Sequence, residues 1–307
     1  MATLEIEKVD LASFCYLNKE RYPFLLESVN HNENNRYSIL FAFPEEKIVL
    51  RDFSDFIFLN ELENQLEPTN DNSNLPFTGG WFVYLSYELI GQIELTLASK
   101  LHKSNIPIAY AVKIPSAVIT DHKLKKTFII DKDGNQTRVN KILSDIKALE
   151  NIPDKAINGK IKEENKKKFT DGVKSSLDYI VAGDVFQVNL SREWSYSLSS
   201  NQDSAIIYQK LKKANPAPFS ALIQYEDFSI ISSSPERLFS VNDGVLETRP
   251  IAGTHPRAKG HLDNTQKENL ISHPKEIAEH VMLLDLERND MGRVCEYGSV
   301  YVNEIMT

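Results

Sequence analysis

In the first half of the chain the hydrophobic positions fall into short runs, each bounded by polar residues or glycine. Runs of this length are typical of β-strands. The polar stretch 70–74 contains no hydrophobic residue and predicts a loop. The expected strands are 38–43, 81–87 after the Gly79-Gly80 break, and 108–119 with 126–131 as an antiparallel pair.

In the second half the hydrophobic spacing becomes helical. Hydrophobic residues recur every three or four positions from Phe169 to Ile180, which predicts an amphipathic helix over 164–181. Gly183 follows directly and is expected to end that helix. The next expected elements are a strand over 185–190 and a helix over 205–214 that stops at Asn215-Pro216.

Two hairpins complete the pattern, around Glu226-Asp227 and around Asn242-Asp243-Gly244. Hairpin-linked strands mixed with helices indicate an α+β fold of layered antiparallel β-sheets with flanking helices, rather than a βαβ fold. Neither a G-x-G-x-x-G pattern nor a Walker lysine is present, so no phosphate-binding glycine loop is expected. The hairpin strands are expected over 219–225 with 228–232 and over 238–241 with 245–248.

A polar stretch over 141–168 separates the two halves. Lysines dominate its end, 160–168, but Glu163 and Glu164 lie among them. This mixture predicts the solvated start of a helix rather than a surface that binds nucleic acid. We therefore expect an N-terminal region, 1–150, and a second region, 151–307, which can still share one folded unit.

The composition is that of a globular protein, with 41% hydrophobic and 25% charged residues. A net charge of -8 argues against general binding of nucleic acid, which needs a basic face. The sequence predicts no signal peptide and no membrane span. Its two cysteines, Cys15 and Cys295, are too few for a disulfide framework, so we expect reduced thiols in a cytoplasmic protein.

Candidate chemistry is concentrated in three blocks of charged and polar residues set among hydrophobic runs. Buried charge is costly unless it is paired, so such blocks are typical of a functional site. The blocks are 233–237 (SSPER), 247–254 (ETRPIAGT) and 278–294 (AEHVMLLDLERNDMGRV).

The third block lies on a helix that we expect to start at Ser272-His273-Pro274, with the serine as cap. Glu276 and Glu279 are three residues apart and share one face near the helix start. Two carboxylates placed in this way suit Mg²⁺. They equally suit the helix dipole and water, and the spacing alone favours this second interpretation.

Opposite charges follow one another from Asp285 to Arg293. For most of these residues we expect an ion-pair network that closes the helix at Gly292. Arg293 could instead hold a carboxylate through two hydrogen bonds, although nothing in the sequence requires it.

The three blocks resemble the chorismate-using enzymes that include component I of anthranilate synthase and of aminodeoxychorismate synthase. The resemblance extends to 182–191 and 215–219, and to Leu25-Leu26-Glu27-Ser28 and Gly79-Gly80-Trp81. It implies that Glu279 binds Mg²⁺ while Glu276 supports the metal without being a direct ligand. It further implies that Gly253 and Thr254 contact chorismate and that Glu236 is catalytic.

In this family ammonia, normally from a glutamine amidotransferase partner, replaces the 4-hydroxyl of chorismate or adds at another ring carbon. The first reaction gives 4-amino-4-deoxychorismate, towards para-aminobenzoate and folate; the second gives anthranilate, towards tryptophan. Mg²⁺ would neutralise the ligand's carboxylate, which matters because the net charge of -8 repels a dianion. Ser28, Pro218, Phe219 and Ser220 match positions that bind tryptophan in the family.

Ala252 separates the possible activities. The well-known aminodeoxychorismate enzymes carry a nucleophilic lysine at this position, whereas anthranilate synthases carry alanine. A lysine adduct is therefore excluded here, although ammonia can still attack directly. The blocks 215–220, 233–237 and 21–44 look closer to the aminodeoxychorismate branch. We favour aminodeoxychorismate synthase narrowly, with anthranilate synthase as the alternative.

The chain ends at Thr307 within a strand-like run, whereas the resemblance implies a longer protein. The further part would supply a histidine, a second Mg²⁺-binding glutamate and contacts to the chorismate carboxylates. We expect residues 1–307 alone to be inactive. The remaining alternative is a chain of this length that binds tryptophan or docks a partner without catalysis.

Overall fold

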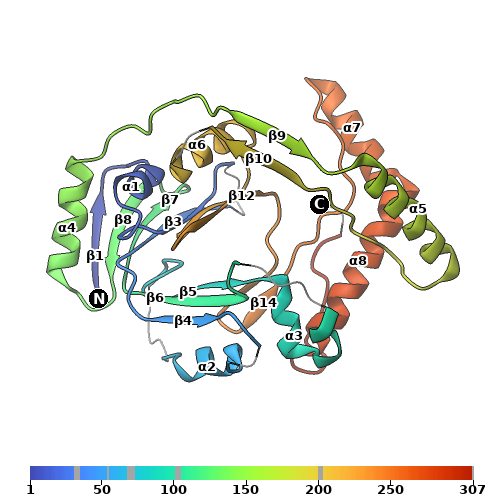
Figure 1. The fold of residues 1–307 in the computed structure, drawn as a ribbon, viewed down its shortest axis with the longest axis horizontal. Helices are drawn as coiled ribbons and strands as arrows, with labels where there is room; N and C mark the ends of the chain where they lie inside the picture. The colour runs from blue at the N-terminus through green and yellow to red at the C-terminus, as the bar shows by residue number, and fades with distance from the viewer. Residues whose placement is uncertain (31–34, 54, 68–72, 101–104, 200–202, 306–307) are drawn as a thin grey trace.

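The computed structural model describes residues 1–30, 35–53, 55–67, 73–100, 105–199 and 203–305. Residues 70–72 of the predicted polar loop lie outside these ranges. Figure 1 shows two β-sheets at one side of the molecule and three helices, α5, α7 and α8, gathered at the other. Within the described residues no helix is long and apolar enough to span a bilayer. The predicted α+β class with antiparallel sheets is confirmed.

The larger sheet has seven strands, and every neighbouring pair is antiparallel. Its last two strands come from the region after residue 150, where they form the predicted hairpin around Glu226-Asp227. The sheet therefore contains strands from both regions that the sequence predicted, 1–150 and 151–307. The division of the chain into these two regions stays a prediction. In order across the sheet the strands are β1 (Ala2–Ile6), β8 (Lys126–Asp131), β7 (Ser116–Asp121), β3 (Tyr37–Ala42), β2 (Phe24–Glu27), β11 (Phe219–Tyr225) and β12 (Phe228–Ser234).

The smaller sheet has three strands, β4 (Lys47–Leu50), β6 (Ala109–Ile114) and β5 (Gly80–Leu85). Here the prediction of one strand over 108–119 was wrong. Pro115 has no N–H to donate, and the chain leaves the smaller sheet as β6 and enters the larger one as β7 at this residue.

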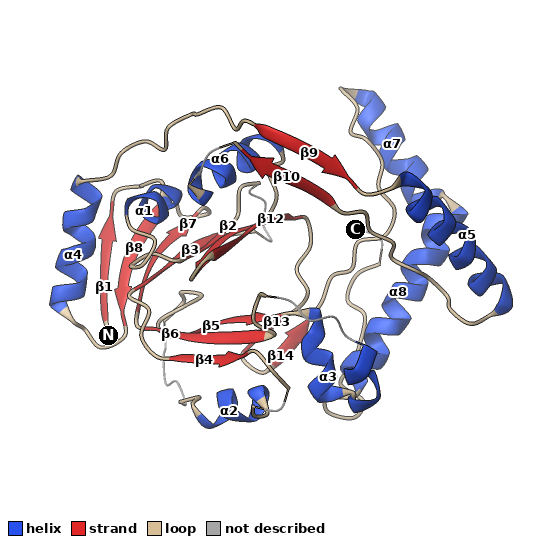
Figure 2. Cartoon of the chain, in the orientation of Figure 1, coloured by secondary structure: helices blue, strands red, loops and turns tan. Residues whose placement is uncertain are grey.

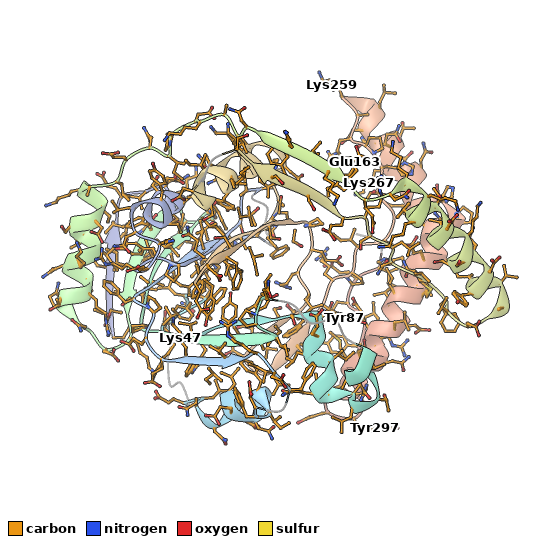
Figure 3. The ribbon with its side chains drawn as sticks, viewed as in Figure 1. Lys47, Tyr87, Glu163, Lys259, Lys267 and Tyr297 are labelled. Atoms are coloured by element: carbon orange, nitrogen blue, oxygen red, sulfur yellow. The ribbon has the colours of Figure 1, made fainter. Side chains whose placement is uncertain are left out.

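The two sheets face each other in Figure 2, and side chains fill the space between them in Figure 3. Many of the residues in the hydrophobic cluster between the sheets are aromatic. Phe24 of β2 stacks on Phe82 of β5 with ring centroids 4.0 Å apart. Tyr225 of β11 stacks on Tyr110 of β6 at 4.1 Å, and the Lys47 ammonium lies 5.4 Å from the Tyr225 ring centroid. Stacked rings of this kind contribute beyond the area that they bury, so this core fixes β11 against the smaller sheet.

Three helices cover the larger sheet and complete its core, namely α1 (Leu11–Leu17), α4 (Gln136–Lys147) and α6 (Ser204–Ala214). The predicted helix over 205–214 is α6, and it begins where the Asp203 carboxylate accepts a hydrogen bond from the Ala205 N–H at 2.8 Å. Short helices flank the smaller sheet: α2 (Phe58–Asn64), η1 (Tyr87–Leu89), α3 (Ile90–Ile93) and η2 (Leu95–Lys100).

The predicted amphipathic helix over 164–181 is α5, Lys166–Ala182. Asn165 caps its start, and Gly183 ends it with φ 81°, a left-handed conformation that favours glycine. The strand expected over 185–190 is absent, because this segment has no ladder partner and the Leu190 side chain instead lies against Gly172 of α5. Residues 160–163, expected to begin a helix, form β9 (Gly159–Glu163), which pairs with β10 (Trp194–Leu198).

The C-terminal part contains the second predicted hairpin, β13 (Ser240–Asn242) with β14 (Val245–Glu247), and two helices. Helix α7 (His261–Ser272) was not predicted from the sequence. Helix α8 (Pro274–Gly292) begins at the predicted proline, but the expected serine cap was wrong: the Ser272 hydroxyl donates to the Glu268 carbonyl at 2.7 Å. None of the residues of α5 and α8 is fully buried.

Candidate functional site

Helix α8 lies against the segment that follows the second hairpin. The Glu276 carboxylate reaches the Gly253 backbone so closely that a Cβ there would lie 1.7 Å from Oε2. One end of this segment thus meets the first turn of α8. At the other end, the Thr248 hydroxyl lies beside the Glu287 carboxyl of the same helix. The structure therefore brings the second and third charged blocks together along the helix.

Glu236 of the first block joins the same cluster. Its Oε1 accepts a hydrogen bond of 2.8 Å from the Ile251 N–H, immediately before Ala252. The Ser234 hydroxyl donates to the Glu236 carbonyl at 3.1 Å and holds the turn before it. The Glu236 side chain is exposed. One of its oxygens is therefore fixed on the 251–254 backbone and the other remains available to a ligand.

Glu279 is approached from a different part of the chain. The Gln187 Nε2 donates to Glu279 Oε1 at 3.5 Å, at the limit of a hydrogen bond. Gln187 belongs to the segment that was expected to be a strand, and its role at the site was not predicted. Only its place in a family-like block, 182–191, could have suggested it.

The carboxylates of Glu276 and Glu279 are the site's candidate metal ligands, and both are half-buried. Mg²⁺ usually takes one or two protein carboxylates and completes its shell with water and ligand oxygens, so this pair fits Mg²⁺ chemically. The described residues contain no cluster of three or more histidine, cysteine or acidic side chains that could hold a metal alone. The pair fits a metal shared with a ligand better than a metal held by protein alone.

The remaining predicted chorismate contacts lie on the same segment. Gly253 is half-buried against Glu276, and Thr254 follows it with an exposed side chain. Ala252 is half-buried and directly follows the residue that binds Glu236. Residue 252 therefore lies next to Ile251 in the chain. Among the described residues, the Ile251 N–H is the only backbone donor that binds the Glu236 side chain.

The predicted ion-pair network on α8 is present in part. Arg288 pairs with Asp285 at 3.0 Å, as expected for that stretch. Arg293 is the C-cap residue of the helix. Glu287 departs from the network: burial, followed by the nearby Glu236 and Asp290 carboxylates, raises its pKa, although the Thr248 hydroxyl lowers it.

The four predicted tryptophan-site residues also lie together, at the β2–β11 pairing. The Val29 N–H donates to the Ala217 carbonyl at 3.0 Å, which ties the end of β2 to the start of β11. The Ser28 hydroxyl donates to the Tyr37 carbonyl at 2.9 Å and the Ser220 hydroxyl to the Ala217 carbonyl at 3.2 Å. Both serines are buried. Pro218 directly precedes β11, and Phe219 is the first residue of that strand.

A family model described as "chorismate binding enzyme" matches residues 22–307. The chain belongs to this family. All three charged blocks and the four residues of the predicted tryptophan site lie within the matched range.

Relatives within the family carry two kinds of name. The chain is 38% identical over 252 residues to aminodeoxychorismate synthase component 1 of Bacillus subtilis. The aligned residues cover 78% of this chain and 53% of that relative. It is 32% identical over 293 residues to an anthranilate synthase component I-like protein of Synechocystis, covering 91% of the chain and 59% of the relative.

The crystal structure of anthranilate synthase component I from Streptococcus pneumoniae has a similar fold. It matches with a TM-score of 0.73 at 26% identity, over 91% of this chain and 66% of that one. The chain thus spans between about half and two thirds of the length of these relatives. These matches establish the family and the fold, and the names of the relatives divide between anthranilate synthase and aminodeoxychorismate synthase.

Proposed function

We propose that the protein is component I of an aminodeoxychorismate synthase, which aminates chorismate to 4-amino-4-deoxychorismate with ammonia from a glutamine amidotransferase partner. The observation that carries the proposal is the hydrogen bond from Ile251 to Glu236. This bond holds the Glu236 carboxylate on the 251–254 segment, which supports the proposed part of Glu236 in catalysis. The identity to the Bacillus subtilis aminodeoxychorismate enzyme supports this branch.

In this proposal each residue has a distinct task. Glu236 moves a proton at the reacting hydroxyl, since its second oxygen is available to the ligand. Gly253 and Thr254 contact chorismate, and the absence of a Cβ at 253 lets the Glu276 carboxylate lie against that contact. Glu279, next to Glu276 on α8, would hold Mg²⁺. The metal, when bound, neutralises negative charge on the ligand's carboxylate and fixes its orientation.

Ala252 determines how nitrogen is delivered. Because alanine has no nucleophile, no protein–ligand bond forms at this position and ammonia attacks the ring directly. The same alanine supports the alternative, anthranilate synthase component I, together with the names of several relatives.

Product analysis separates these two activities. The protein expressed from its natural reading frame is incubated with chorismate, ammonium and Mg²⁺, and the products are resolved by mass spectrometry and fluorescence. We expect 4-amino-4-deoxychorismate, which gives para-aminobenzoate only after a lyase is added. Fluorescent anthranilate that forms without a lyase would overturn the choice of branch.

A chain of residues 1–307 alone is measured in parallel. We propose that it does not turn over chorismate, because it spans only between about half and two thirds of the length of its relatives. Measurable turnover by this chain would contradict that statement while leaving the choice of product open.

A further inference from the structure

The strand that leads to Glu236 has a strand neighbour on one side only among the described residues. It is β12, the last strand of the larger sheet, and near its end Ser233 pairs with Ser220 of β11. Glu236 follows the end of β12 after a single residue, Pro235, which has no N–H to donate. The position of Glu236 therefore depends on how firmly the end of β12 is held.

The Ser233 side chain gives this strand end a second support. Alternate residues of a strand point to the same face, and Ile231 of β12 packs on the core that α6 covers. Two residues further on, the Ser233 hydroxyl donates to the Asn215 carbonyl at 2.5 Å. Asn215 is the C-cap residue of α6, which lies beside β12 (Figure 1). The bond therefore ties the end of β12 to the end of a helix.

Helix α6 is itself held by the larger sheet. Glu27 at the end of β2 accepts two hydrogen bonds from α6, from the Tyr208 hydroxyl at 2.7 Å and from the Lys212 ammonium at 2.7 Å. Tyr208 is fully buried. The last carbonyl groups of a helix have no partner within the helix, so the Asn215 carbonyl can accept a hydrogen bond from outside it. Ser233 is thus bonded to a fixed part of the fold.

From this strand end, further hydrogen bonds lead to the carboxylate. The Ser234 hydroxyl donates to the Glu236 carbonyl at 3.1 Å, and the Ile251 N–H donates to Glu236 Oε1 at 2.8 Å. These two bonds lie within the turn and between the turn and the 251–254 segment. The bond of Ser233, in contrast, connects the turn to a helix that packs on the sheet.

We propose that Ser233 is a positioning residue for Glu236. Its bond to Asn215 holds the end of β12 where the following turn brings the Glu236 carboxylate to the Ile251 N–H. The inference rests on the proposed catalytic role of Glu236. Ser233 acts through that carboxylate and takes no part in the chemistry. Without the Ser233 hydroxyl, Glu236 stays in the chain but is held less firmly on the 251–254 segment.

The first test measures the site without using activity. Amide hydrogen exchange in the 251–254 segment is compared between the wild type, Ser233→Ala and Ser233→Thr, all expressed from the natural reading frame. Threonine keeps the hydroxyl and suits a strand. The matched control is Ser272→Ala, because the Ser272 hydroxyl also donates to a backbone carbonyl, that of Glu268. Ser272 and Glu268 are both exposed residues of α7.

Exchange at Ile251 should be faster in Ser233→Ala by between about two-fold and about ten-fold, the range that corresponds to the net strength of one hydrogen bond. Ser233→Thr and Ser272→Ala should exchange as the wild type does. Unchanged exchange in Ser233→Ala overturns the proposal, and so does exchange in Ser233→Thr that is as fast as in Ser233→Ala.

The second test measures turnover of chorismate with ammonium and Mg²⁺. Ser233→Ala should lower kcat by between about ten-fold and about a hundred-fold, because a displacement of about 1 Å in a positioned group can cost a hundred-fold. KM should stay the same, since the residues proposed to contact chorismate, Gly253 and Thr254, are unchanged. Ser233→Thr should restore the kcat of the wild type, and a kcat as low as that of Ser233→Ala would overturn the proposal.

A double-mutant cycle separates positioning from a general structural effect. In a Glu236→Gln background, Ser233→Ala should lower kcat no further, because Ser233 acts only through the carboxylate that is already lost. A further ten-fold loss in that background overturns the positioning role. If the wild type does not consume chorismate, the proposed function fails, while the exchange measurement still decides whether Ser233 positions Glu236.

Discussion

Gly253 and Glu276 are in such close contact that the site tolerates no side chain between them. A Cβ on Gly253 would lie 1.7 Å from the Glu276 Oε2 and 2.4 Å from its Cδ. The φ angle of Gly253 is not in the left-handed region, so the constraint is space rather than backbone conformation. The contact joins the proposed chorismate segment to the proposed metal-binding end of α8.

Replacing Gly253 by alanine should therefore displace the Glu276 carboxylate and disturb the site. Because the displaced atoms are the far end of a flexible side chain, the melting temperature should change little. A shift of about 1 Å in a positioning contact can lower turnover about a hundred-fold, and we expect a loss of that order. Steady-state kinetics with chorismate, ammonium and Mg²⁺ provide the measurement. Gly292→Ala is the matched control, since a Cβ there meets no atom within 4 Å.

Acid should selectively weaken the larger sheet through Asp131 at the end of β8. Burial of this carboxylate would raise its pKa, but hydrogen bonds from Arg138, Ser116 and the Asn135 N–H outweigh burial and lower the pKa. A lowered pKa contributes stability above the ordinary aspartate value, about 3.9, which is lost as the pH falls through the lowered one.

Asp131→Ala should consequently destabilise the protein by about 3 kcal/mol at neutral pH, because it leaves Arg138 without its buried partner. Urea unfolding at neutral pH and at acid pH measures this free energy. The difference from the wild type should shrink in acid; an equal difference at both pH values would argue against the ion pair as the cause. Asp133→Ala, at an exposed carboxylate that contacts the same arginine, is the control.

Tryptophan should stabilise the protein if Ser28 and residues 218–220 form its pocket. A ligand at a hundred times its Kd adds about 2.7 kcal/mol to the free energy of unfolding, which raises the melting temperature by several degrees. Thermal melts with tryptophan, and with phenylalanine for comparison, provide the measurement. No shift at saturating tryptophan would show that these residues do not form a tryptophan pocket.

Much of the fold could be predicted because the signals are local. The turn at Glu226-Asp227 defines the β11–β12 hairpin, and Glu226 adopts φ 50° there. Gly183 marks the end of α5 in the same direct way. Pairings between distant segments have no such signal. The β9–β10 ladder joins Ile161 to Tyr196, and nothing near either residue announces its partner.

The same division applies to the candidate site. Helical spacing alone places Glu276 and Glu279 on one face of α8. The bond from Ile251 to Glu236, the contact of Gly253 with Glu276 and the approach of Gln187 depend on the folded chain. The departure of Glu287 from the expected ion-pair network also depends on the folded chain. The sequence shows many charged residues near Glu287, but it does not show which of them its carboxyl group faces.

We propose that Glu236, the 251–254 segment and α8 together form a chorismate site. The most direct measurement is chorismate consumption with ammonium and Mg²⁺ by the wild type, Glu236→Gln and the exposed control Glu268→Gln, all expressed from the natural reading frame. We predict that Glu236→Gln retains its melting temperature and loses between about 10²-fold and 10⁴-fold in turnover, as removal of a proton-transfer group does, while the control matches the wild type. Equal turnover by Glu236→Gln and the wild type would contradict the claim.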